Sequence, residues 1–302
     1  MIFINPDSDK IISAREYHVE KLIVLLEQRV VQLRRSSKIT NSQALFLNKI
    51  IIPKLKNILG DNPKKIKQIS ESISLSVIQK KAVKELFDYS KWFAIKKGRV
   101  YNAYVLAEKL DINTCVYCNR NYTVTVKDIT RPQFDHYFLQ AKNPLLALSF
   151  YNLIPSCSIC NTTIKGKNEL LLKEHLHPYM DNCSGDFRFS YCYDNDMKHS
   201  LKVKINYKKK KSKTERTLDF FKVKEVYNAH TDELNDLIKT RGAFSDKYLE
   251  ILSSKILKET KIGKSELYQL AFGVYLDDNN ASKRPFTKFK KDILTELGIV
   301  KE

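Results

Sequence analysis

The stretch that decides the fold runs from residue 115 to residue 161 and reads CVYCNRNYTVTVKDITRPQFDHYFLQAKNPLLALSFYNLIPSCSICN. It begins with the pair Cys115 and Cys118, and a second pair, Cys157 and Cys160, stands at its end. Both sulfurs of such a pair can reach one ion, and two pairs complete a tetrahedral thiolate site for Zn²⁺. Four thiolates leave no open position for water, so we expect this zinc to be structural and its binding to be coupled to folding.

The segment between the two cysteine pairs contains the residues with a predicted chemical role. Asp135 and Asn161 offer a carboxylate and an amide oxygen, which are ligands that a hard divalent ion such as Mg²⁺ or Mn²⁺ prefers. His136 is the candidate general base, because the ordinary pKa of histidine lies near neutrality. Alternation along a strand would send Asp135 and His136 to opposite faces, so their joint use requires a twisted strand end or action on different sides of a phosphate. The set predicts metal-dependent hydrolysis of phosphodiester bonds.

Further polar residues of this region have two interpretations each. Asn152 either holds the His136 tautomer by a hydrogen bond or is a turn residue. Lys165 lies four residues after Asn161, on the same face of a continuing helix, where it either contacts a phosphate or is solvated. His177 is either a supplementary base or phosphate contact at the rim of the site, or a loop residue. Asn161 itself could instead cap the helix that the second cysteine pair opens.

The run Cys-x-x-Cys, Asp-His, Asn-Leu-x-Pro-x-Cys-x-x-Cys-Asn resembles the zinc-containing HNH (ββα-metal) endonucleases, which include the phage recombination endonuclease VII. The resemblance implies a β-hairpin and a helix around one catalytic divalent ion, with a separate zinc in the cysteine pairs. It implies metal-ligand roles for Asp135 and Asn161, the general-base role for His136, and the middle Asn of the motif for Asn152. Asn161 stands where the motif's name has its final His, a variant that the family contains.

A narrower resemblance covers roughly residues 100–300 and is to PtuB, the HNH subunit of Septu-type anti-phage systems. It rests on the stretches LSFYNL at 148–153, LHPY at 176–179, FFKVKEVYNAH at 220–230 and KRP at 283–285. This resemblance implies a role in phage defence and a partner ATPase of the ABC/SMC-like class (PtuA-like).

The chain is strongly basic, with a formal net charge of +19 over 302 residues. Residues 1–110 hold 21 basic and 10 acidic side chains and residues 186–302 hold 25 and 18, whereas residues 111–185 hold 7 and 6. Such a field attracts polyanions, of which nucleic acid is the commonest. A hydrophobic fraction of 43% with eight Gly and eight Pro favours a chain with a packed core over a disordered or fibrous one.

Neither a signal peptide nor an apolar run long enough to span a bilayer is expected, which favours a cytoplasmic protein without membrane association. Cysteines there are reduced, so paired spacing favours metal binding over disulfides. Cys183 and Cys192 fit neither pair and are expected to be free thiols.

The rest of the chain is expected to be largely helical. Periodic leucines between residues 22 and 33 predict one helix, and a second should run from about residue 41 to Gly60, divided at Pro53, with Pro63 opening the next. Strand-like composition predicts a strand at 122–126 and a hairpin over 187–207 that turns at 194–196. Beyond it we expect a helix from Phe220 to Gly242 and shorter helices at 246–258, 264–276 and 284–298.

We therefore expect an α+β, predominantly helical protein in three segments. Residues 1–110 form a helical scaffold or partner-docking segment, or a nucleic-acid-binding one. Residues 111–185 form a zinc-stapled ββα nuclease core, and residues 186–302 form a β-hairpin followed by helices.

The alternatives are the same chemistry on RNA such as tRNA, a noncatalytic zinc module that binds nucleic acid or protein, and a restriction or recombination nuclease without an ATPase. DNA is the favoured substrate, although the motif does not distinguish the sugar. A single site cuts one strand, so double-strand breaks require two copies or two events, which is consistent with a homodimer within a larger complex.

Overall fold

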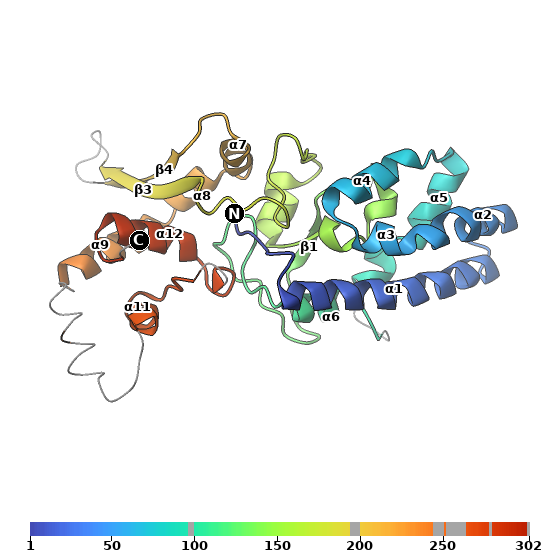
Figure 1. The fold of residues 1–302 in the computed structure, drawn as a ribbon, viewed down its shortest axis with the longest axis horizontal. Coiled ribbons are helices and arrows are strands. Elements are labelled where there is room, and N and C mark those ends of the chain that lie inside the picture. Colours follow the sequence, from blue (N-terminus) through green and yellow to red (C-terminus); the bar gives the residue numbers. More distant parts are fainter. Residues whose placement is uncertain (96–99, 194–199, 244–250, 252–263, 278–279, 301–302) are drawn as a thin grey trace. The chain divides into compact units, whose positions relative to one another are not determined.

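The computed structural model confirms the α+β class, with many helices and two small antiparallel sheets among the residues that it describes (Figure 1). The residues that it describes are 1–95, 100–193, 200–243, 251, 264–277 and 280–300. Within them, no helix is both long enough and apolar enough to cross a membrane. The expected turn at 194–196 and the expected helix at 246–258 lie outside the described residues, except for residue 251.

The chain folds into two compact units. One consists of residues 4–112 and 123–173, and the other of residues 1–3, 113–122 and 174–302. These limits differ from those of the three expected segments, because stretches far apart in the sequence pack together. The N-terminal helices therefore belong to the same unit as the Asp135-His136 strand.

The helices of residues 1–110 are confirmed, and they begin and end near the expected signals. Pro53 lies in the short 3₁₀ helix that divides α2 from α3, and Pro63 opens α4 behind the cap of Asn62, whose side chain accepts from Lys65 N. The elements are α1 (Asp9–Arg35), α2 (Asn41–Phe46), η1 (Leu47–Ile51), η2 (Ile52–Lys54), α3 (Leu55–Gly60), α4 (Pro63–Ser72), α5 (Val77–Leu86), η3 (Tyr89–Phe93) and α6 (Ala103–Leu110).

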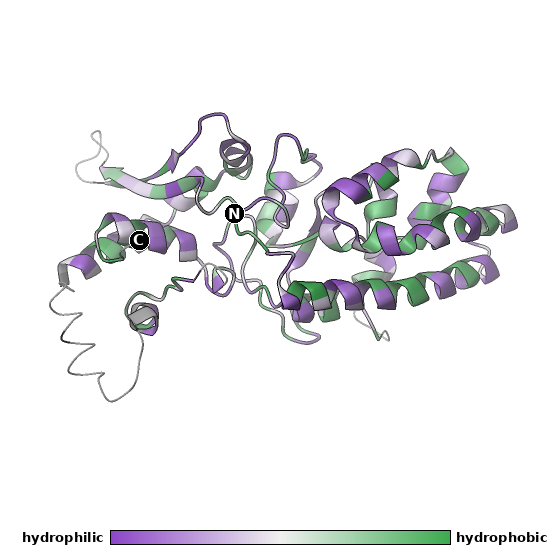
Figure 2. Ribbon diagram, in the orientation of Figure 1, coloured by the Kyte–Doolittle hydropathy of each residue, from purple (hydrophilic) through white to green (hydrophobic). Residues whose placement is uncertain are grey.

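Helix α1 is amphipathic, as bands of hydrophobic and hydrophilic residues along it show (Figure 2). Its buried face carries Leu22, Leu26, Val30 and Leu33, which recur at three- and four-residue steps. Full burial of such side chains contributes about 1.5–3 kcal/mol each, so this face is a main source of stability for its unit. The helix packs against α3, α5 and α6.

His18 lies on the same buried face and is completely inaccessible to solvent. Its Nδ1 is 2.6 Å from the Tyr101 hydroxyl and its Nε2 donates to the Leu148 carbonyl oxygen over 2.7 Å. Burial lowers the His18 pKa to about 4, so the ring is neutral at pH 7. The two hydrogen bonds link α1 to Tyr101 and Leu148, which follow His18 by 83 and 130 residues in the sequence.

The first sheet consists of β1 (Gln133–His136) and β2 (Leu153–Ser156), which pair with Asp135 opposite Ile154 and His136 opposite Leu153. The short helices η4 (Pro144–Leu146) and η5 (Phe150–Asn152) lie between these strands. Directly after β2 comes η6 (Ile159–Lys165), a wide helical turn of the π type that contacts β1. The Asp135-His136 pair therefore stands on the first of two antiparallel strands, and a helix follows the second strand.

The second sheet confirms the expected hairpin. It pairs β3 (Phe187–Tyr193) with β4 (Leu201–Tyr207), and Phe187 and Phe189 of β3 and Val203 of β4 are buried. Helix α12 packs against β3, and α8 packs against β4. The helices that follow the sheet are α7 (Lys213–Phe220), α8 (Val223–Asn228), α9 (Thr231–Ala243), α11 (Lys264–Phe272) and α12 (Thr287–Glu296).

Two expectations of secondary structure are wrong. Residues 122–126 form only isolated bridges, of Tyr122 with Thr114 and of Val126 with Thr130, because their backbone finds no extended neighbouring strand. The helix expected from Phe220 to Gly242 is interrupted, because Lys222 adopts a left-handed conformation (φ 52°) that ends α7 before α8 begins.

The burial of His18 predicts a stability loss in weak acid. The unfolded chain protonates His18 at its ordinary pKa near 6.5, whereas the folded chain does so only near pH 4. The unfolded state therefore binds more protons in this window, and stability falls as the pH is lowered through it. Urea unfolding should show that wild type loses about 3 kcal/mol more than His18→Gln between pH 6.5 and pH 4. Equal losses in both proteins would contradict this account of His18.

Candidate metal centre and neighbouring acid–base residues

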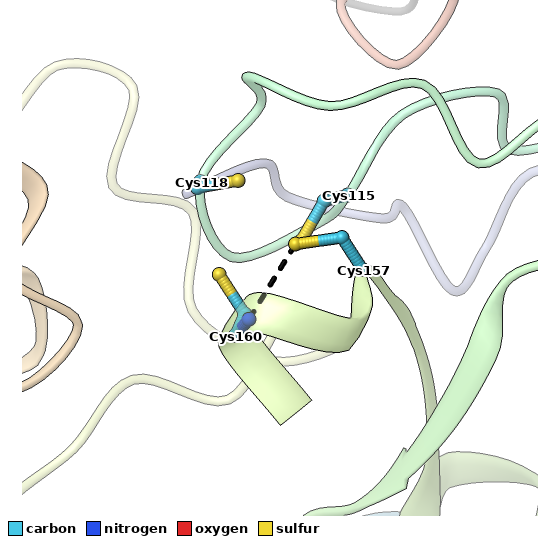
Figure 3. Close-up of side chains that lie close together, drawn as sticks. All are labelled: Cys115, Cys118, Cys157 and Cys160. Atoms are coloured by element: carbon cyan, nitrogen blue, oxygen red, sulfur yellow. Dashed lines mark hydrogen bonds between the residues drawn. The ribbon is translucent and has the colours of Figure 1, made fainter. Parts of the chain in front are cut away.

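The four cysteines of the two pairs form one cluster. Their Sγ atoms all lie within 4.8 Å of one another, and all four residues are buried. Figure 3 shows Cys115 and Cys118 on one loop, Cys157 and Cys160 where η6 begins, and the sulfur atoms gathered together. The backbone N–H of Cys160 donates to Cys157 Sγ over 3.5 Å, a contact that stabilises a thiolate.

The loop of the first cysteine pair is closed by its own backbone. Asn119 N donates to Cys115 O over 2.8 Å, and Cys115 N donates to Asn121 O over 3.0 Å. Asn119 adopts the left-handed conformation that this tight turn requires (φ 48°), and Asn is among the residues that tolerate it. The loop thereby brings both sulfurs of the pair close together.

The cluster fits a zinc ion in ligand type, number and spacing. Zinc–sulfur bonds of about 2.3 Å in a tetrahedron place the sulfurs about 3.8 Å apart, within the spread found here. Four buried thiols without a metal would leave weak donors and acceptors in an apolar setting, whereas a metal deprotonates them and uses every sulfur. The cluster can therefore hold a metal ion such as Zn²⁺, and it would hold it in a closed site.

Lys165 and Asp135 form a buried ion pair. Lys165 Nζ donates to Asp135 Oδ1 over 2.9 Å and to the backbone oxygen of His136 over 2.8 Å. Their side chains are 1% and 3% exposed, respectively. The expectation of a solvated Lys165 is therefore wrong. Its ammonium instead contacts β1.

Asn161 contacts the same strand through the residue two positions before Asp135. Its Nδ2 donates to Gln133 Oε1 over 3.0 Å, and Gln133 and Asp135 share a face of β1 because side chains alternate along a strand. Asn161 and Lys165 are four residues apart on η6. One face of β1 is therefore matched to one face of η6, and this brings Asp135 and Asn161, the two expected ligands of a divalent ion, to the same side of the sheet.

These two residues fit a hard divalent ion in donor type, since both offer oxygen atoms. The Lys165 ammonium, however, already occupies Asp135 Oδ1. An ion at Asp135 would have to share this carboxylate with Lys165 or displace it.

His136 is partly buried and faces away from the Asp135 side of β1. Its Nε2 lies 2.9 Å from the Ala147 backbone oxygen, and burial lowers its pKa. A carbonyl oxygen only accepts hydrogen bonds, so Nε2 carries the proton in the neutral ring and Nδ1 is the nitrogen that can accept one. Alternation along β1 is therefore maintained, as expected, and no bulge brings Asp135 and His136 to one face.

Asn152 positions His136 indirectly. It is fully buried, its Oδ1 accepts from Phe138 N over 2.7 Å, and its Nδ2 donates to the carbonyl oxygens of Phe138 and Leu146. Leu146 directly precedes Ala147, whose carbonyl fixes the His136 tautomer. The acceptor for His136 is thus a backbone group, and Asn152 holds the segment that presents it.

Two residues of this region were not expected from the sequence, Tyr89 beside His136 and Arg131 beside Tyr89. The ring of Tyr89, on η3, meets the His136 ring edge-on with centroids 4.9 Å apart. Burial raises the pKa of Tyr89, and the interaction with the Arg131 guanidinium opposes this effect in part. Tyr89 lies 47 positions before His136 in a segment without a recognisable motif, so only the tertiary packing brings it there.

His177 is fully buried in the unit that contains residues 174–302. Its backbone N–H donates to Asp181 Oδ2 over 2.7 Å, and its Nδ1 accepts from Tyr179 N over 3.3 Å. These bonds organise the turn around Pro178, and an auxiliary role for His177 in catalysis stays a prediction. Cys183 and Cys192 are free thiols, as expected.

Comparisons of this chain with protein-family models, with curated proteins and with solved structures found no match.

The cysteine cluster predicts that zinc and stability are lost together. Cys157→Ser removes one ligand of a closed site, so elemental analysis should find zinc well below one equivalent per chain and thermal unfolding should begin at a lower temperature. Cys192→Ser, outside the cluster, is the matched control and should keep both. A Cys157→Ser protein that unfolds at the wild-type temperature without zinc would contradict a structural role for the metal.

The buried ion pair predicts strong coupling between its two members. Lys165→Met leaves the Asp135 carboxylate buried without its partner and should destabilise the protein by about 3–5 kcal/mol in denaturant unfolding. The double variant with Asp135→Asn removes the stranded charge, so it should be more stable than Lys165→Met alone. Additive losses in this double-mutant cycle would show that the pair is not coupled.

Proposed function

We propose that this protein is an HNH-type, divalent-metal-dependent endonuclease with a separate structural zinc. The observation that carries the proposal is the placement of Asp135 and His136 on β1, antiparallel to β2, with Asn161 on the helix that follows. This is the arrangement of strand, strand and helix that the resemblance to HNH endonucleases implies, and it lies next to a cluster of four cysteines able to hold zinc.

In the proposed reaction, His136 accepts a proton from the attacking water. The Ala147 carbonyl keeps the proton of the neutral ring on Nε2, so Nδ1 is the basic nitrogen. The lowered pKa keeps the ring neutral at pH 7 and ready to accept a proton. The ring is held by Tyr89 on its edge and by the segment that Asn152 fixes, which limits the entropy lost in reaching the reactive geometry.

A bound Mg²⁺ or Mn²⁺ would neutralise charge that develops on the phosphate and the leaving oxygen. Asp135 and Asn161 are the residues that would hold it. Because Asp135 and His136 leave β1 on opposite faces, the base and the metal ligands would act on different sides of the scissile phosphate. Lys165 balances the Asp135 charge when the divalent ion is absent.

The substrate and partners are proposed from the resemblance and the charge. A net charge of +19 favours a polyanionic substrate. DNA is the proposed substrate, and RNA is the alternative with the same site. The PtuB resemblance adds a cytoplasmic anti-phage complex with an ABC/SMC-like ATPase, in which two copies of the nuclease could cut both strands.

A noncatalytic zinc module is the second candidate. The buried pairing of Lys165 with Asp135 favours it, because a purely structural ion pair needs no second metal. The fixed tautomer of a partly exposed histidine beside that pair favours the enzyme, since a structural role would not require an accessible ring.

The proposal predicts a large loss of activity without the base. His136→Ala should lower the rate of cleavage of labelled DNA and RNA in Mg²⁺ by about 10²–10⁴-fold, the usual contribution of a general base. The assay should use the complex purified from the native host, with and without ATP, because the partner can be required. Zinc content and thermal unfolding should stay at wild-type values.

His175→Ala is the matched control, since His175 packs its ring against Phe220 outside the proposed site. It should cleave at the wild-type rate. If His136→Ala cleaves at the wild-type rate, His136 is not the base. If the wild-type complex cleaves neither DNA nor RNA under any of these conditions, the noncatalytic module is favoured.

A further inference from the structure

A basic cleft of about 520 Å³ lies in the unit that contains residues 174–302. One wall is the turn around Met180 and Asn182, and the other is the segment from Lys209 to Arg216, which connects β4 to the first turn of α7. This connecting segment is strongly hydrophilic in Figure 2. We call this site the lysine cleft. It contains none of the residues proposed for catalysis.

The charge balance of the lysine cleft is positive. Four cationic side chains line it, those of Lys209, Lys211, Lys213 and Arg216, against two carboxylates. Both carboxylates are already engaged: Asp181 pairs with Lys213 at 3.3 Å, and Asp186 accepts from the Thr214 hydroxyl at 2.9 Å. The cleft is therefore suited to an anion rather than to a metal ion.

The cationic wall is held in place by bonds to the backbone. Arg216 Nε donates to the Glu174 carbonyl over 3.1 Å, and its Nη1 donates to the Lys211 carbonyl over 2.6 Å. The Lys211 backbone N–H donates to Glu215 on the first turn of α7. The guanidinium and the loop are thus positioned before a ligand arrives, which reduces the entropy cost of binding.

Further exposed lysines lie outside the cleft, on β4 and directly after it. Lys202 and Lys204 are exposed and share one face of the strand, with positions two residues apart and thus about 6.6–6.8 Å from each other. Lys208 and Lys209 follow directly where the strand ends. Cationic side chains spread over residues 202–216 outnumber those that a single phosphate or mononucleotide can engage, and they fit an anionic polymer.

We propose that the lysine cleft, together with Lys202 and Lys204 of β4, binds the phosphodiester backbone of nucleic acid independently of its sequence. The ligand class rests on the proposed function, but the binding needs neither the base nor a divalent ion. Backbone contacts of this kind position a duplex and carry no base specificity, and each one releases a condensed counterion.

The test is fluorescence-anisotropy binding of a labelled 20-base-pair DNA duplex to the full chain, without added divalent metal and over a series of salt concentrations. The variant Lys209→Gln/Lys211→Gln removes two charges from the cleft. Its affinity should fall on the order of tenfold or more, and the slope of log K against log salt should become shallower by about 1.8. The matched control Lys224→Gln/Lys239→Gln removes two exposed charges of the same unit outside the cleft and should leave the slope near that of wild type.

Equal effects of the two double variants would overturn the proposal, because binding would then follow net charge alone. If inorganic tripolyphosphate displaces the labelled duplex as well as unlabelled duplex does at the same concentration of charge, the cleft is a small-anion site. Lysine-dependent binding of polyglutamate without binding of DNA would show a protein-binding site. DNA binding that depends on the cleft, in a protein that never cleaves, would support the lysine cleft and count against the proposed nuclease. Cleavage together with DNA binding that does not depend on the cleft would support the nuclease and count against the lysine cleft.

Discussion

The buried ion pair between Lys165 and Asp135 is the interaction on which the candidate site depends. Removing two charges from water costs several kcal/mol for each ion, so such a pair persists only where hydrogen bonds compensate it. Lys165 meets this condition with two acceptors on β1, Asp135 Oδ1 and the His136 backbone oxygen. The pair therefore holds η6 against β1, while alternation along the strand leaves the His136 side chain on the opposite face.

The two candidate metal sites differ in the ligand atoms that they present. The cysteine cluster presents four soft sulfurs with closed geometry, so a bound zinc has no position left for substrate. The Asp135 side of β1 presents oxygens beside an internal cation, so a divalent ion must compete with an ammonium. In the proposed function, substrate phosphate would favour the divalent ion in this competition by adding further negative charge.

Much of this arrangement could be predicted from local sequence. The cysteine spacing predicted the cluster, and capping and proline signals such as Asn62-Pro63 predicted helix boundaries, because each acts over a few residues. What could not be predicted arises from packing between distant segments. Tyr89 reaches His136 only through the folding of η3 against β1, and the burial of Lys165 reverses the usual preference of lysine for solvent. Residues 122–126 have strand composition but no extended partner.

The most direct test of the proposed metal site is a titration of zinc-loaded protein with Mn²⁺ in the presence of an uncleaved phosphodiester analogue. Electron paramagnetic resonance monitors how much Mn²⁺ is bound at each step. Wild type should bind Mn²⁺ at a single tight site, and Asp135→Asn should lose that site while its zinc content stays unchanged. Identical Mn²⁺ binding by the two proteins, or no tight Mn²⁺ binding by wild type, would contradict the claim that the Asp135 side of β1 is a catalytic metal site.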